Sequence, residues 1–144
     1  MKIEDMPIGM LLSRAARKHM EKIHQSLERY GVQKTFGPIL RELSIAEGKT
    51  QAELAEGMGI SPPSMSVNLQ KMEQAGFLIR KTDDEDMRQI RLFLTRKGKS
   101  TAGKAGREIA ATDRKLVEAL TQEEEAELKN LLTKILIHQG RNEA

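Results

Sequence analysis

The order of secondary structure elements is clearest in residues 61–98, which read SPPSMSVNLQKMEQAGFLIRKTDDEDMRQIRLFLTRKG. Ser61 can cap the free backbone N–H groups of a helix, and the two prolines after it are tolerated where no intrahelical donor is required. The inner face of this helix would carry Met65, Leu69 and Met72. The spacing of these apolar residues predicts a helix with one buried face over residues 61–75.

A β-hairpin is predicted directly after this helix. Gly76 suits the left-handed conformation that ends a helix, and residues 77–81 have the composition of a strand. Residues 90–95 alternate between apolar and polar side chains, which is typical of a half-buried strand. The connection between the strands holds four consecutive acids, Asp83, Asp84, Glu85 and Asp86. These features predict a long hairpin over residues 77–95 with a polar tip.

A short helix is predicted ahead of these elements. Thr50 and Glu53 have the spacing of a capping box, in which each side chain accepts a hydrogen bond from the backbone N–H of the other residue. Gly59 would end this helix after barely two turns. A short helix, a tight turn, a second helix and a hairpin follow one another in a winged helix-turn-helix. The order therefore predicts such a lobe over residues 35–98, with the helix-turn-helix at 50–75.

The rest of the chain is predicted to be helical. Amphipathic spacing indicates helices over residues 8–27, 36–46, 97–119 and 121–138. The expected fold class is mainly α with a small β-hairpin wing, in a single domain of residues 1–144. The first and the last two helices have more apolar surface than the short central elements can cover. Residues 1–31 and 100–144 are therefore expected to form dimerisation helices.

Composition excludes several classes of function. The chain has 144 residues with 24 Lys and Arg, 21 Asp and Glu and no Cys, so it is mildly basic and cannot form a disulfide, a thiolate metal site or a cysteine nucleophile. It lacks the run of about 18 to 20 apolar residues that a membrane span needs, so a soluble, cytoplasmic protein is expected. No phosphate-binding glycine loop, nucleophile elbow or His-Glu-x-x-His motif is present. We therefore expect no enzymatic activity, no cofactor and no metal site.

The second helix of the motif would present a polar face outward. That face carries hydroxyl and amide side chains with one proline, one valine and one lysine, at Ser61, Pro63, Ser64, Ser66, Val67, Asn68, Gln70 and Lys71. Short side chains can approach base edges, amides suit adenine, valine can meet a thymine methyl, and lysine suits a phosphate. These residue types predict that the helix contacts base edges and phosphates of double-stranded DNA.

The hairpin carries a family resemblance. The pattern D-x-R-x5-L-T-x2-G, found at the wing of the MarR family of bacterial transcriptional regulators, is matched by Asp86, Arg88, Leu94, Thr95 and Gly98. The resemblance implies that residues 61–75 lie in the major groove. It also implies that Arg88 enters the minor groove and that Asp86 orients it by a charge-assisted hydrogen bond. Arg91, on the second strand, is a further predicted DNA contact.

The resemblance also implies a homodimeric repressor that binds a palindromic operator. Many members of the family have an arginine where this chain has Val67, so an A·T-rich operator is favoured. The family often binds small aromatic anions between the dimer helices and the DNA-binding lobe, and Tyr30 and Phe36 are the candidate ligand-binding residues. The alternative function is a winged-helix protein-interaction module that never engages DNA. Salt and the loss of Arg88 would not change the binding of such a module in the way expected for DNA.

Overall fold

The computed structural model describes residues 1–143. In chain order its elements are the 3-10 turn η1 (Ile3–Asp5), α1 (Ile8–Glu28), α2 (Phe36–Ile45), α3 (Gln51–Met58), α4 (Pro62–Gln74), β1 (Leu78–Thr82), β2 (Ile90–Leu94), α5 (Arg96–Leu116) and α6 (Gln122–Asn142). The mainly α fold class with a β-hairpin wing is therefore confirmed. Within residues 1–143, none of the helices is both long and apolar enough to cross a membrane.

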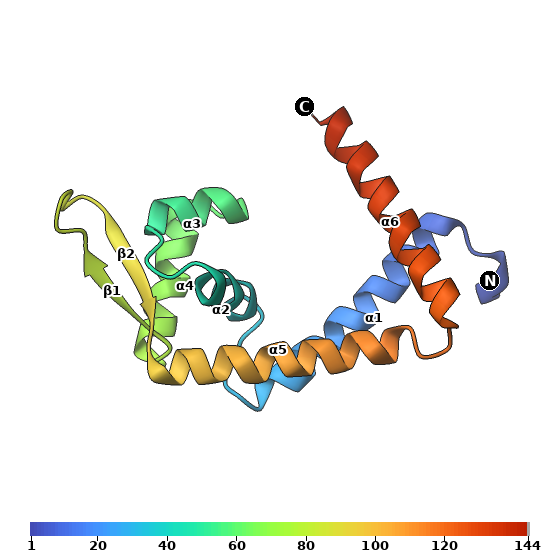
Figure 1. Cartoon of the computed structure of the whole chain (residues 1–144), viewed down its shortest axis with the longest axis horizontal. Coiled ribbons are helices and arrows are strands. Elements are labelled where there is room, and N and C mark those ends of the chain that lie inside the picture. Colours follow the sequence, from blue (N-terminus) through green and yellow to red (C-terminus); the bar gives the residue numbers. More distant parts are fainter. Residues whose placement is uncertain (144) are drawn as a thin grey trace.

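The central helices and the hairpin form a lobe at one end of the long helix α5 (Figure 1). α2, α3, α4 and the hairpin gather around the start of α5, and α1 packs against α5 further along. α6 turns away from the opposite end of α5, and none of its residues is buried. The candidate functional side chains of the helix-turn-helix and the hairpin are thus concentrated in the lobe.

One hydrophobic core fills the lobe. Most of its fully buried side chains come from α2, α3, α4 and the hairpin, and they include Phe36, Ile39, Leu40, Leu43, Leu54, Met65, Leu69, Met72, Phe77 and Leu92. The rings of Phe36 and Phe77 meet edge to face, with their centroids 6.1 Å apart. The inner face predicted for α4 is confirmed, because its three apolar residues are all fully buried.

The predicted helix caps are confirmed in detail. The Thr50 hydroxyl accepts the Glu53 N–H and the Glu53 carboxylate accepts the Thr50 N–H, each at 3.1 Å, so the capping box is complete. Gly59 and Gly76 adopt the left-handed conformation, with φ of 64° and 84°. These two glycines let α3 and α4 stop sharply and fix the lengths of both helices.

The last two helices end at other residues than expected. α5 ends at Leu116 instead of residue 119, because the Leu120 N–H bonds to the Val117 carbonyl in a turn that leads to the next helix cap. α6 continues to Asn142 instead of stopping near residue 138, since no proline interrupts its exposed end.

The hairpin is held on both edges of β2. On one edge, β1 and β2 pair antiparallel, from Leu78 opposite Leu94 to Thr82 opposite Ile90. On the other edge, the Leu92 N–H bonds to the Lys49 carbonyl and the Leu92 carbonyl accepts the Gly48 N–H, both at 2.9 Å. Residues 48–50 therefore fix the hairpin to the start of α3. No local sequence signal indicates this pairing.

The junction of β2 and α5 has no spare room. The Thr95 N–H bonds to the Phe77 carbonyl at 3.0 Å, and the Thr95 hydroxyl donates to the Gly76 carbonyl at 2.5 Å while it accepts the Gly98 N–H at 3.0 Å. A Cβ added to Gly98 would lie 1.9 Å from the Phe77 carbonyl oxygen. The same Cβ would lie 3.3 Å from the side chain of Leu94, which is buried. Only glycine fits there, so packing at this junction explains Leu94, Thr95 and Gly98 of the wing pattern.

Gly98→Ala should destabilise the protein by about 3 kcal/mol, because β1 or α5 must shift to admit the methyl group. Gly106→Ala, on the same helix and with nothing within 4 Å of its added Cβ, should be neutral or stabilising by about 0.5 to 1 kcal/mol. Urea denaturation followed by circular dichroism measures both values. Equal changes for the two variants would contradict a close contact at Gly98.

Candidate nucleic-acid interface

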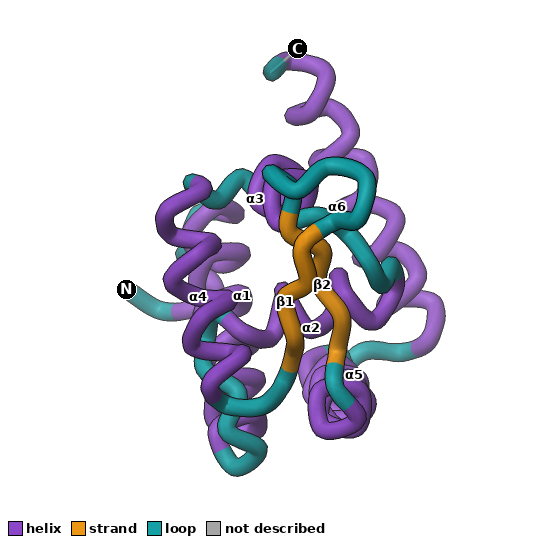
Figure 2. The backbone as a smooth tube through the Cα atoms, turned by 90° about the vertical axis from the view of Figure 1, so that its left-hand side faces the viewer, coloured by secondary structure: helices purple, strands orange, loops and turns teal. Residues whose placement is uncertain are grey.

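Helix α4 lies beside the hairpin in the lobe (Figure 2), and it presents a polar face at the surface. Of the residues predicted to contact DNA, those on the open face are Ser61, Pro63, Ser64, Val67, Gln70 and Lys71. Ser66 and Asn68 are half-buried. Val67 is 52% exposed although it is apolar, so its methyl groups are available to a ligand. The face combines hydroxyl, amide, apolar and cationic groups, as contacts to base edges and phosphates require.

The first turn of α4 offers hydroxyl groups to a ligand. Pro62 and Pro63 have no backbone N–H, and the Ser64 N–H is already bonded to the Ser61 hydroxyl at 3.3 Å. The Ser61 hydroxyl in turn donates to the Ser64 hydroxyl at 2.9 Å. Any hydrogen bond from this turn to a phosphate therefore has to come chiefly from the serine side chains.

Arg88 is held in place at the tip of the hairpin. Its Nε lies 3.1 Å from Asp86 Oδ1, and the same oxygen accepts the Arg88 backbone N–H at 3.1 Å. The Arg88 side chain is nevertheless 90% exposed. The carboxylate thus fixes the base of the guanidinium group and leaves its outer end open to solvent, which is the pairing geometry that the wing pattern implied.

Arg91 connects the wing to the loop that precedes α3. Its Nη1 donates to the Gly48 carbonyl at 2.8 Å, and its Nε lies 3.3 Å from Asp83 Oδ1. The hydrogen bond from Arg91 lowers the pKa of the Asp83 carboxyl below its ordinary value. Two nitrogens of the Arg91 guanidinium are therefore engaged inside the protein, and two of the four acids of the hairpin have basic partners. Asp84 and Glu85 are exposed.

A second set of contacts fixes the hairpin relative to α4. One Glu73 oxygen accepts the Arg80 backbone N–H at 3.1 Å, and the other lies 3.4 Å from both Nε and Nη2 of the Arg80 guanidinium. Lys97, on α5, donates from Nζ to the Ala75 carbonyl at 2.6 Å, which joins α5 to the end of α4. The partners in these two contacts lie seven and 22 residues apart in sequence, so local sequence motifs do not predict the pairing.

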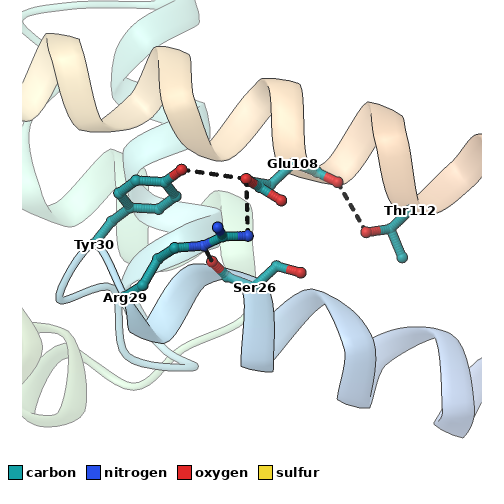
Figure 3. Close-up of polar contacts among 5 residues, drawn as sticks. All are labelled: Ser26, Arg29, Tyr30, Glu108 and Thr112. Carbon is teal, nitrogen blue, oxygen red and sulfur yellow. Dashed lines mark hydrogen bonds and ion pairs between the residues drawn. The ribbon is translucent and has the colours of Figure 1, made fainter.

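The two candidate ligand-binding aromatic residues lie in different surroundings. Tyr30 is half-buried, and its hydroxyl donates to Glu108 Oε1 in α5 at 3.2 Å (Figure 3). The same oxygen lies 3.1 Å from Arg29 Nη2. Phe36 instead packs against Phe77 in the core and is fully buried, so its ring faces no open crevice.

Metal-ligating side chains are dispersed in the part of the chain that the structure describes. Residues 1–143 contain no group of three or more His, Asp or Glu side chains able to hold a metal ion. His19 pairs with Asp113 through Nε2 and Oδ1, which are 3.0 Å apart. This contact, like that between Tyr30 and Glu108, joins the α1 side of the molecule to α5.

Comparison with known proteins adds independent information. A family model described as MarR family matches residues 30–89. The HTH-type transcriptional repressor Rv2887 of Mycobacterium tuberculosis is 30% identical over 132 residues, which span 92% of this chain and 95% of the relative. The similarity therefore extends over nearly the whole of both chains.

Solved structures agree with this similarity. A MarR transcriptional regulator from Methanosarcina mazei superposes with a TM-score of 0.81 at 26% identity, over 95% of this chain and 98% of the other. The repressor CouR, bound to a 23-mer DNA duplex, gives a TM-score of 0.80 at 26% identity, with 90% and 92% covered. The Rv2887 complex with DNA gives 0.74 at 28% identity, with 91% and 98% covered.

Arg91→Ala should lower the free energy of unfolding by about 1 kcal/mol, because the Gly48 carbonyl loses its charged donor. Thermal denaturation measures the loss. The matched control is Arg96→Ala, which removes the same charge from an exposed position at the start of α5 and should change stability by less than about 0.5 kcal/mol. Identical melting temperatures for the two variants would show that Arg91 does not brace the wing.

Proposed function

Because the chain belongs to the MarR family of winged helix-turn-helix transcriptional regulators, we propose that it is a repressor that binds double-stranded DNA through α4 and the wing. The family consists of regulators, not enzymes. The observation that carries the proposal is the joint exposure of the polar face of α4 and of Arg88, on elements that Glu73 and Arg80 hold together. The DNA complexes of Rv2887 and CouR support it by similarity.

In this proposal α4 enters the major groove. The side chains that would contact base edges or the adjacent sugars are Ser61, Pro63, Ser64, Ser66, Val67, Asn68 and Gln70. Lys71 would pair with a phosphate, since an ammonium group is a compact charge on a flexible stem. Val67 would pack against a thymine methyl group, which gives contact with an A·T pair and none with guanine.

The wing would bind the adjacent minor groove. Arg88 would enter that groove with its guanidinium oriented by Asp86, whose carboxylate holds it at 3.1 Å. Arg91 would act indirectly, by keeping the wing fixed to residues 48–50 while it binds. A side chain held in its binding geometry loses less conformational entropy on complex formation than a free one.

We infer a homodimer formed by residues 1–31 and 100–144. These segments expose large apolar side chains at Ile3, Ile8, Met10, Leu11, Leu12, Met20, Leu116, Leu120, Leu128, Leu131, Ile135, Leu136 and Ile137. An apolar surface of this extent is uncommon on a soluble monomer. A two-fold dimer would bury it and bring two α4 helices about 34 Å apart, one turn of DNA.

The operator of such a dimer would be an imperfect palindrome, because two-fold symmetry repeats each contact in the opposite half-site. A·T pairs are expected where α4 reads the major groove, since its exposed face carries no arginine for guanine. The protein would act in the cytoplasm, where bacterial operators lie.

A small aromatic anion is the proposed effector. Tyr30 is the side chain suited to contact it, because the Arg29 guanidinium and the Lys104 ammonium lie 5.4 and 5.8 Å from its ring centroid. The Glu108 carboxylate already engages Arg29, so an anionic ligand with a flat apolar body would pair with Lys104 beside the ring. Phe36 is fully buried in the core, so it would not contact the effector directly.

Arg88→Ala should weaken binding to the operator about 10-fold or more, because a minor-groove contact is lost. Lys71→Ala should weaken specific and non-specific binding alike and reduce the slope of log affinity against log salt by about 1. Fluorescence anisotropy measures both effects, on a site first selected from randomised duplexes by the wild-type protein. Arg41→Ala, exposed on α2, is the charge-matched control and should bind as the wild type does.

Two outcomes would contradict this proposal. One is the absence of any selected sequence. The other is an affinity that does not change with salt or with Arg88→Ala. Either result would favour a winged-helix module that binds protein partners.

Leu131→Glu should separate the dimer, because Leu131 lies on α6, is 48% exposed and would be buried between the protomers. The variant should be monomeric at micromolar concentration and should bind the full operator at least about 10-fold more weakly, since one half-site contributes less free energy than two. Sedimentation equilibrium gives the mass, and anisotropy gives the affinity. Ile45→Glu, at an exposed apolar position on α2, is the control that should remain dimeric. A monomeric wild type would refute the dimer.

A further inference from the structure

The tip of the wing is a fixed turn. The Gln89 N–H bonds to the Asp86 carbonyl at 2.9 Å, and the Asp83 N–H bonds to the Gln89 carbonyl at 2.9 Å. The Asp86 side chain also accepts the Arg88 N–H, as aspartate commonly does at the first position of a β-turn. The two central residues of this turn are Met87 and Arg88, so these two side chains form its apex.

Met87 is the apolar half of that apex. It is 82% exposed, whereas Met65 and Met72, which fill the core, are completely buried. The turn itself does not require methionine at this position, because most residues can occupy the centre of such a turn. Within the described residues, the core contains no contribution from Met87. Its apolar surface therefore contributes nothing to the packing of the lobe and is available to a ligand.

The charges around the apex select the ligand. Asp84 and Glu85 precede the turn and are exposed, so phosphates would repel this side of the loop. Arg88 provides a cation at the apex, and the Asp86 carboxylate beside it is already engaged. The apex is thus the part of the loop that can enter a groove between two phosphate backbones, and it would enter with both of its side chains.

We propose that Met87 enters the minor groove together with Arg88 and selects against guanine at the base pairs beneath the wing. The inference rests on the proposed function, since it requires the wing to bind DNA. Consecutive Cα atoms are about 3.8 Å apart, so a turn that brings Arg88 into the minor groove also brings Met87 to the edge or the interior of that groove. Methionine is among the apolar side chains that proteins insert in minor grooves.

The chemistry of the groove floor gives the selectivity. Guanine projects an N2 amino group into the minor groove, whereas A·T pairs present only acceptors there. A thioether is a weak acceptor, so it would strip water from the guanine amino group without replacing the lost hydrogen bond. Over an A·T pair the same side chain can pack against the sugars while Arg88 donates to the acceptors. Met87 therefore favours A·T through apolar contact, independently of the bases read by α4.

The test varies the base pairs under the wing in the selected operator. Three duplexes carry A·T, G·C or inosine·C there, and inosine·C lacks the amino group in the minor groove while it keeps the major-groove pattern of G·C. The wild type should bind A·T and inosine·C with affinities within about 2-fold and G·C about 10-fold more weakly. Met87→Ala should bind all three within about 3-fold. Ile45→Ala, the matched exposed apolar control, should keep the wild-type pattern.

The outcomes separate this inference from the proposed function. If Met87→Ala keeps the full preference against G·C, or if the wild type treats inosine·C as it treats G·C, Met87 does not read the guanine amino group. If the wild type binds none of the duplexes, or if Arg88→Ala binds as tightly as the wild type, the proposed function of the wing fails and the inference fails with it. Circular dichroism of each variant shows that the lobe remains folded.

Discussion

The close approach of Gly98 to the Phe77 carbonyl determines how the parts of this molecule meet. The carbonyl accepts the Thr95 N–H, and the α5 backbone lies so near that a Cβ at residue 98 would be 1.9 Å from it. Phe77 also anchors the core through Phe36. One peptide group therefore connects the hairpin, the core and the long helix. The wing pattern has two halves: Asp86 and Arg88 form the exposed tip, and the other three residues form this junction.

Charge pairing inside the lobe decides which cations remain available to DNA. Arg80 is bound by Glu73, Arg91 by Asp83 and the Gly48 carbonyl, and Lys97 by the Ala75 carbonyl. Of these contacts, the one between Glu73 and Arg80 fixes the hairpin relative to α4. The net charge of the chain is only +3, so the positions of a few basic side chains matter more for DNA binding than the overall electrostatic field of the protein does.

Features set by local chemistry could be predicted from the sequence. The capping box of Thr50 and Glu53, the left-handed Gly59 and Gly76, and the inner face of α4 depend on residues within a turn or two of each other. Long-range contacts could not be predicted in this way. The partner of Arg91 lies 43 residues away and that of Tyr30 lies 78 residues away.

The sequence predicts Phe36 as a ligand-binding residue, but in the structure its ring is buried against Phe77 in the core. The sequence pattern predicts no role for Met87, because a single methionine in a polar loop has no periodicity.

The wing is preorganised at the place where it would bind DNA, and this would affect how it discriminates between DNA sequences. Asp86 fixes both the backbone and the Nε of Arg88, and residues 48–50 hold β2 from its second edge. A rigid apex gains little by adapting to an unsuitable groove, so a poor fit appears as lost affinity and not as a rearranged loop. A flexible loop carrying the same arginine would accommodate many grooves. The carboxylate at the base of the turn would therefore support specificity even though it carries the same negative sign of charge as DNA.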